Sequence, residues 1–170
     1  KAGKLSFKNV IIFNAYEYFP LNVENVNRSI NQLKKQLLYH IDIDAQNVYT
    51  PDGSISQEAV QEHCRLYEQR IKTFGGLDAI LLGIGRMGNI ATNEPGSSLT
   101  STSRLILIDE TSREEMKMSF GSQDTVPPCS ITMGIETILS ARKIFLTAWG
   151  DEKADIIKKT VEGGITDAVP

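Results

Sequence analysis

The sequence of 170 residues is poor in the residue types that build metal centres and disulfide scaffolds. It contains only two cysteines, Cys64 and Cys129, and two histidines, His40 and His63. No CxxC or HxxxH spacing occurs, so we expect no His/Cys metal site. Two cysteines without a motif also exclude a disulfide-rich scaffold. We expect both to be reduced thiols in the core of a cytoplasmic protein.

Long apolar runs and a surplus of basic residues are also missing. No run approaches the roughly 20 apolar residues that cross a membrane. Residues 1–4 lack the apolar segment of a signal peptide. The formal net charge is −3 and no basic stripe is present, so we expect neither a nucleic-acid nor a membrane partner. A composition of 41% hydrophobic and 23% charged residues is typical of a globular protein.

Short apolar runs alternate with amphipathic stripes along the whole chain. Strands are expected at 9–14, 47–50, 79–82, 104–108, 130–133 and 143–148, and helices at 22–39, 60–74, 111–119, 135–141 and 151–161. This alternation predicts an α/β fold, a doubly wound and mostly parallel sheet with helices on both faces. Because no repeat, linker or low-complexity segment interrupts it, residues 1–170 are expected to form a single domain.

Closely spaced glycines follow the expected strand at 79–82. Gly83-Ile-Gly85-Arg-Met-Gly88 matches the G-x-G-x-x-G spacing of dinucleotide-binding loops, and Asp109 ends a strand roughly 20 residues later, where a ribose-binding acid is expected. That mechanism also needs a helix that starts at the glycines. Pro95-Gly96 and the serines and threonines that follow leave no room for one. A nucleotide-binding module is therefore the weaker of two interpretations of this loop.

Read as far as Ser98, the same segment resembles the signature GxGxDGHIAFNEPGSS of glucosamine-6-phosphate deaminases, also called isomerases. Three other segments resemble the family in the same order: Ser6-Phe-Lys-Asn-Val-Ile-Ile-Phe-Asn-Ala-Tyr-Glu-Tyr18, Ile131-Thr-Met-Gly-Ile135 and Gly150-Asp-Glu-Lys-Ala154. The resemblance extends over essentially the whole chain. It implies the same α/β fold, a sugar-phosphate ligand, no cofactor and a reaction that releases ammonia from glucosamine 6-phosphate. Family members often form homo-oligomers, but no feature of this sequence fixes a subunit count.

The chain departs from the family pattern at the residues that would do the chemistry. The position of the general base, an aspartate in the family, is Tyr16, and a tyrosine with a pKa near 10 is a poor base at neutral pH. The aspartate and histidine that assist ring opening correspond to Met87 and Asn89, neither of which can transfer a proton. The family's phosphate-binding arginine falls near Met118. Of the Asp-His-Glu relay only Glu94 remains.

Several residues have both a functional and a structural interpretation. The resemblance implies that Gly83, Gly85, Gly88, Asn93 and Lys153 contact the substrate, Lys153 as a phosphate ligand. Glu94 is either a surviving acid or a cap on the backbone of its own turn. Glu17 could replace the missing base, but adjacent strand residues face opposite sides. Arg104, where the family has a regulatory arginine, is interpreted as a charge at a strand edge. Trp149 is interpreted as a packing residue.

Three functions remain open from the sequence. The family resemblance favours an amino-sugar-phosphate deaminase or isomerase. The altered residues favour a non-catalytic homologue that binds a sugar phosphate or a partner subunit. The glycine spacing alone favours a nucleotide-binding module. Compared with the family pattern, the sequence also lacks an N-terminal unit with a phosphate-cradling loop and a closing C-terminal strand, so we expect a fragment or a truncated form.

Overall fold

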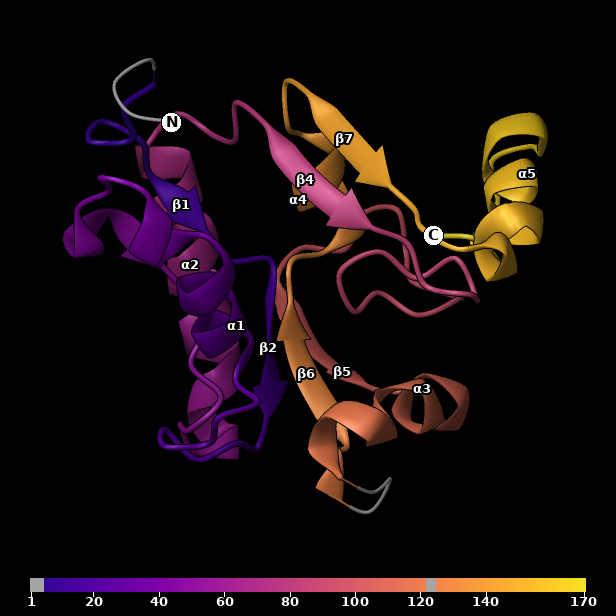
Figure 1. Ribbon diagram of the computed structural model, residues 1–170, viewed down its shortest axis with the longest axis horizontal. Coiled ribbons are helices and arrows are strands. Elements are labelled where there is room, and N and C mark those ends of the chain that lie inside the picture. The colour runs from indigo at the N-terminus through magenta and orange to yellow at the C-terminus, as the bar shows by residue number, and fades with distance from the viewer. Residues whose placement is uncertain (1–4, 122–124) are drawn as a thin grey trace.

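Strands and helices alternate along residues 5–121 and 125–170, which are the residues that the computed structural model describes. The strands are β1 (Ile12–Phe13), β2 (Tyr16–Phe19), β3 (Val48–Tyr49), β4 (Ile80–Gly83), β5 (Arg104–Leu107), β6 (Cys129–Thr132) and β7 (Ile144–Thr147). The helices are α1 (Ser29–Gln36), α2 (Val60–Thr73), α3 (Glu110–Phe120), α4 (Ile135–Leu139) and α5 (Ala154–Glu162). The predicted α/β fold is confirmed (Figure 1).

The strands form three small sheets of two kinds. β1 pairs with β3, and β4 with β7, in parallel. β2, β6 and β5 form an antiparallel sheet with β6 in the middle. This antiparallel sheet was not expected from the sequence, which favoured a mostly parallel arrangement. It arises because the chain changes sheets at Asn14 and Ala15: the Asn14 N–H donates to Tyr49 beside β1, whereas the Ala15 carbonyl accepts from Met133 after β6.

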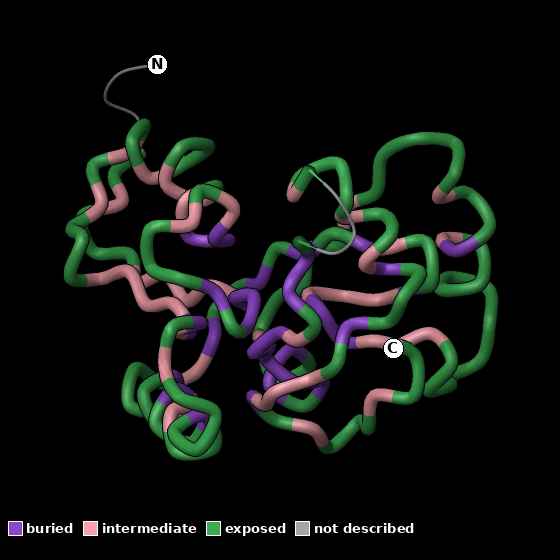
Figure 2. Tube along the Cα trace, turned by 90° about the horizontal axis from the view of Figure 1, so that it is seen from below, coloured by how far each residue is buried: buried purple, intermediate pink, exposed green. Residues whose placement is uncertain are grey.

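Helix α2 packs against one face of the antiparallel sheet. Its buried residues Val60 and Cys64 meet Phe19 and Ile131, and Tyr67 and Ile71 continue into a second cluster beneath β4. Gly75 and Gly76 end the helix with φ angles of 86° and 87°. Such angles are open to glycine without steric cost, so these residues form the predicted C-cap. Buried residues accordingly gather in the middle of the molecule (Figure 2).

The first helix is shorter than expected. It begins at Ser29 rather than near residue 22, because two asparagines form local turns ahead of it. The Asn22 side chain accepts from the Glu24 N–H and the Asn25 side chain from the Asn27 N–H, and such turns compete with helix formation. The apolar residues that suggested an earlier start, Val23 and Val26, are 57% and 68% exposed.

One face of the β4–β7 pair is not covered by the described chain. Leu81 on β4 pairs in register with Phe145 on β7, and the two are 72% and 53% exposed. Trp149, expected to be a packing residue, is 77% exposed because it follows this open strand pair. Both cysteines are free, Cys64 buried and Cys129 half-buried. No described helix combines the length and apolar character required to span a membrane.

Candidate functional site

The segment that leaves β4, residues 84–103, folds onto the face of the antiparallel sheet opposite α2. The hydroxyl of Thr92 donates to that of Ser130 at 2.9 Å, and the Thr92 N–H donates to the hydroxyl of Thr132 at 3.4 Å. Asn93, which is fully buried, donates its amide to the carbonyls of Ile90 and Met133. This face also carries Tyr16, because Tyr16 pairs with Thr132 in the ladder.

Two glycines in this segment are required by close contacts. A side chain at Gly85 would overlap the Asn89 side chain, and Gly88 has a φ of 88° with Val169 and Ile156 directly above it. Residues near the C-terminus thus cover the glycine loop, and the Gly96 N–H also donates to the Asp167 carbonyl. Ala91 lies in the left-handed region with a φ of 49°, a conformation that is uncommon for non-glycine residues.

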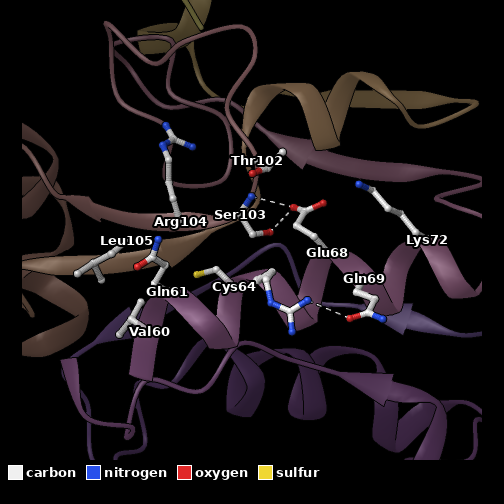
Figure 3. A pocket seen from close by; sticks show the side chains of 11 residues that line it. Val60, Gln61, Cys64, Glu68, Gln69, Lys72, Thr102, Ser103, Arg104 and Leu105 are labelled. Carbon is white, nitrogen blue, oxygen red and sulfur yellow. Dashed lines mark hydrogen bonds between the residues drawn. The ribbon is translucent and has the colours of Figure 1, made fainter. Parts of the chain in front are cut away.

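Arg104 joins β5 to the Asn-Glu-Pro-Gly turn. Its guanidinium donates to Asn93 Oδ1 at 2.9 Å and to the Ser97 hydroxyl at 3.0 Å. Burial lowers the pKa of Arg104. Figure 3 shows the side chain leaving β5 away from α2, toward this segment. Arg104 does begin the edge strand β5, as expected, but alternation along β5 also turns its side chain toward the face that the loop covers.

Glu94, the retained acid, is held by helix α3 rather than by its own turn. Its Oε2 accepts a hydrogen bond from the Ser112 hydroxyl at 3.1 Å. The amide of Asn89 donates to the same hydroxyl at 3.4 Å. Among the described residues, Glu94 Oε1 is buried and has no hydrogen-bond partner. The interpretation of Glu94 as a cap on the turn is thus wrong, since its side-chain partner is Ser112.

The surroundings of Glu94 favour its protonated form. Burial raises the pKa of the carboxyl, and the negative charges of Asp109 and Glu115 raise it further, whereas interactions with the Ser112 hydroxyl and the Asp109 backbone lower it. The net shift is upward because burial is the largest effect. A carboxyl group with a raised pKa can exchange protons nearer neutral pH than an exposed one.

Tyr16, the residue at which the sequence resemblance places a general base, lies on β2. Its ring packs edge-on against Tyr18, with centroids 5.6 Å apart, in a cluster that includes Met116 and Phe120 of α3. Burial raises its pKa above the ordinary tyrosine value. Fewer than about one tyrosine in a thousand is ionised at pH 7 when its pKa is 10 or higher. The group at this position is therefore a neutral phenol.

Glu17, which the sequence offered as an alternative base, does not face the loop. It is fully buried on the other side of β2. One carboxylate oxygen accepts from the Ser29 N–H at 2.8 Å and from the Tyr18 N–H at 3.0 Å, and the other accepts from the Arg28 guanidinium at 3.3 Å. Arg28 also contacts Asp52. These contacts fix Glu17 as the anchor of β2 on the start of α1.

The remaining expected site residues lie around the same loop. Met87 is 47% exposed on the glycine loop, and Met118 is 89% exposed on α3. Lys153 is half-buried at the N-terminal end of α5, one turn before Ile156, which contacts Gly88. Gly83 ends β4. Residues 84–103, all of them described, contain no helix, so the helix that a dinucleotide loop requires is not formed after Gly88.

A separate cavity of about 700 Å³ lies on the opposite side of the antiparallel sheet, between α2 and β5 (Figure 3). Its lining includes Val60, Cys64, Glu68, Lys72, Ser103 and Leu105. Glu68 is held there by Ser103, whose N–H and hydroxyl both donate to one carboxylate oxygen, and by the Thr137 hydroxyl. None of the site residues expected from the family signature lines this cavity.

Sequence reasoning missed Ser112 and Arg28. Ser112 precedes no motif and lies 18 residues beyond Glu94 in the chain. The only available signal was the capping pattern at Asp109, whose side chain accepts from the Thr111 N–H and so places Ser112 in the first turn of α3. Arg28 lies in a region that was expected to be helical.

Comparisons with known proteins define the class and then the family. A family model described as Glucosamine-6-phosphate isomerases/6-phosphogluconolactonase matches residues 1–170. The chain is 58% identical over its full length to a glucosamine-6-phosphate deaminase-like protein of Bacteroides thetaiotaomicron, of which it covers 26%. It is 39% identical over 167 residues to the glucosamine-6-phosphate deaminase of Oceanobacillus iheyensis, of which it covers 66%.

Solved structures agree with this assignment. A monomeric glucosamine-6-phosphate deaminase superposes with a TM-score of 0.93 at 36% identity over 98% of this chain and 68% of its own. The 6-phosphogluconolactonase of Thermotoga maritima shares the fold, with a TM-score of 0.72 at 14% identity. The match covers 98% of this chain and 69% of the lactonase chain. The fold is thus that of an α/β sugar-phosphate isomerase or lactonase. The chain belongs to the glucosamine-6-phosphate isomerase/6-phosphogluconolactonase family, and it spans about a quarter to two thirds of the curated relatives described here.

Proposed function

We propose that this chain binds an amino-sugar phosphate at the loop of residues 84–98 and does not move the proton between C1 and C2 of the sugar. The observation that carries the proposal is the environment of Tyr16, which keeps its phenol protonated. A half-buried phenol whose pKa is raised by burial stands where the resemblance implies a general base, and the neighbouring carboxylate, Glu17, is engaged by Arg28 and Ser29. Without a base of suitable pKa, proton abstraction from carbon is slow.

The binding part of the proposal is supported by the retained loop. Glu94 and Asn93 keep the family's residue types, and Asn93 is fixed by Met133, Ile90 and Arg104. A rigid loop with a carboxyl group can bind hydroxyl or ammonium groups of a sugar. Lys153 precedes α5, whose Ile156 lies against Gly88 of the loop, and is the candidate positive charge for a phosphate.

A second candidate is a working deaminase that uses Glu94 for proton transfer. The raised pKa of Glu94 favours it, because an acid that titrates nearer neutral pH can serve in both protonation states. The two candidates differ in one measurable respect. The deaminase releases ammonia from glucosamine 6-phosphate, whereas the binding protein only binds it.

The test uses the longest natural protein that contains this chain. Ammonia release from glucosamine 6-phosphate is measured for the parent, for Tyr16→Phe and for the triple variant Tyr16→Asp/Met87→Asp/Asn89→His, with binding followed by calorimetry. We expect a silent parent that binds the sugar phosphate and a triple variant that regains turnover. Turnover by the parent would favour the second candidate, and its loss in Tyr16→Phe would identify the phenol as the base. A parent that neither turns over nor binds would contradict both candidates.

A further inference from the structure

Ser112 lies at the centre of a short hydrogen-bonded chain behind the loop. It is 3% exposed in the first turn of α3. Its hydroxyl accepts from Asn89 Nδ2 at 3.4 Å and donates to Glu94 Oε2 at 3.1 Å. A hydroxyl has one proton to donate. Because that proton goes to Glu94, the chain has one direction, from the amide through the hydroxyl to the carboxyl group.

We infer that Ser112 is a positioning residue, which connects Asn89 to Glu94 and fixes the Glu94 carboxyl in the orientation in which it meets the bound sugar. The inference rests on the proposed function, and it identifies the residue that orients Glu94 in the proposed binding site. The family signature has a histidine at the position of Asn89. An amide is shorter than an imidazole and cannot exchange a proton, and here the Ser112 hydroxyl spans the distance between the amide and the carboxyl.

The position of Ser112 is itself fixed by α3. The Asp109 side chain accepts from the Thr111 N–H at 2.8 Å, which sets the first turn of the helix. Ser112 follows directly and points from that turn toward the loop, as its two contacts require. The Glu94 carboxyl thus lies on the loop after β4, whereas the Ser112 hydroxyl that orients it lies on α3.

The charges around this chain are few and can be named. Asp109, the N-cap of α3, and Glu115 within α3 lie near enough to Glu94 to act on it electrostatically. Glu115 is in turn paired with Arg86 of the glycine loop at 3.7 Å. Neither Asn89 nor Ser112 titrates near neutral pH. Within the Asn89–Ser112–Glu94 chain, pH therefore acts through Glu94 alone.

The experiment compares Ser112→Ala, Ser112→Thr and the control Ser119→Ala in the longest natural protein that contains this chain. Ser119 is exposed near the other end of α3. The affinity for glucosamine 6-phosphate is measured by calorimetry between pH 5 and pH 9, and the crystal structure of ligand-free Ser112→Ala is compared with that of the parent. Ionisation of the ligand itself is common to all variants and cancels in the comparison.

We expect Ser112→Ala to weaken binding about tenfold and to move the midpoint of the pH dependence upward, because the hydrogen bond that lowers the pKa of Glu94 is lost. Ser112→Thr should restore both, and Ser119→Ala should match the parent. In the crystal, the Asn89 and Glu94 side chains should turn away from their parental positions. An equal loss at every pH with an unmoved midpoint would overturn the inference, as would unmoved side chains. A parent that does not bind contradicts the proposed function instead, and the crystal comparison still decides the role of Ser112.

Discussion

Adjacent residues on one short strand have opposite roles in this protein. Tyr16 faces the loop and α3, whereas Glu17 faces α1 and is buried beneath Arg28. The carboxylate next to Tyr16 in sequence therefore points away from the loop, as alternation along a strand requires. On the loop side lies Glu94, whose pKa depends on burial, on contacts with Ser112 and Asp109, and on the charge of Glu115.

The raised pKa of Glu94 predicts a specific pH dependence of stability. A carboxyl with a raised pKa in the folded state contributes stability that is complete below its unfolded pKa and is lost as the pH rises through the folded value. Glu94→Gln, which mimics the protonated acid, should match the parent near pH 4. At pH 8 it should unfold about 2–4 °C higher at most, since solvent screens a partly buried group. Thermal unfolding followed from pH 4 to pH 8 measures this difference.

The matched control for that experiment is Glu24→Gln. Glu24 is an exposed residue in the turn before α1. Its substitution should leave the pH dependence of the melting temperature as it is in the parent. If Glu94→Gln were less stable than the parent at pH 8, the carboxylate would be the preferred form and the proposed environment of Glu94 would be wrong.

Between elements, the ion pair of Arg28 with Glu17 attaches β2 to the start of α1. Arg28→Met removes the cation and leaves a fully buried carboxylate with backbone donors only. Breaking a buried pair in this way costs about 3–5 kcal/mol in free energy of unfolding. The double variant Glu17→Gln/Arg28→Met should recover part of that loss. Urea unfolding of the three proteins measures both quantities, and a loss below about 1 kcal/mol for Arg28→Met would show that the pair is effectively solvated.

An element could be predicted from the sequence where neighbouring residues determine it, and could not where contacts between distant segments determine it. Helix α2 could be predicted, because Val60, Cys64, Tyr67 and Ile71 repeat at helical spacing and two glycines end it. The late start of α1 depends on asparagine side chains that bond their own backbone, and apolar spacing does not report such turns. The antiparallel sheet depends on a change of partner at Asn14 and Ala15, which is a property of the assembled fold.

The place of the candidate loop in the chain could be predicted from the sequence, but the contacts that hold the loop could not. The signature placed Glu94, Asn89 and Met87 on one loop after β4, and the structure puts them there. It could not show that Ser112 and Arg104 hold this loop, because both come from segments beyond it and follow no fixed spacing. Arg104 projects from the side of β5 that the loop covers. Which side that is depends on the tertiary structure and cannot be inferred from the local sequence.

On the scale of the whole molecule, the uncovered face of β4 and β7 predicts how the isolated 170-residue chain behaves. Leu81 and Phe145 form adjacent exposed apolar positions on it, and exposed apolar patches promote association. The chain should self-associate in sedimentation velocity, and Leu81→Ser/Phe145→Ser should shift it toward monomer. Met118→Ser, which removes an exposed methionine elsewhere, should change nothing. Monomeric parent protein at high concentration would contradict this prediction.

The contact of Val169 and Ile156 with Gly88 has a consequence for synthesis of the protein. A ribosome makes the glycine loop long before it makes the residues that cover it. During that interval β4 lacks its partner β7 as well, since β7 also follows in the chain. The loop of residues 84–98 therefore cannot gain all of its final contacts until the chain is nearly complete, and a nascent chain that stalls before residue 156 lacks the residues that cover Gly88.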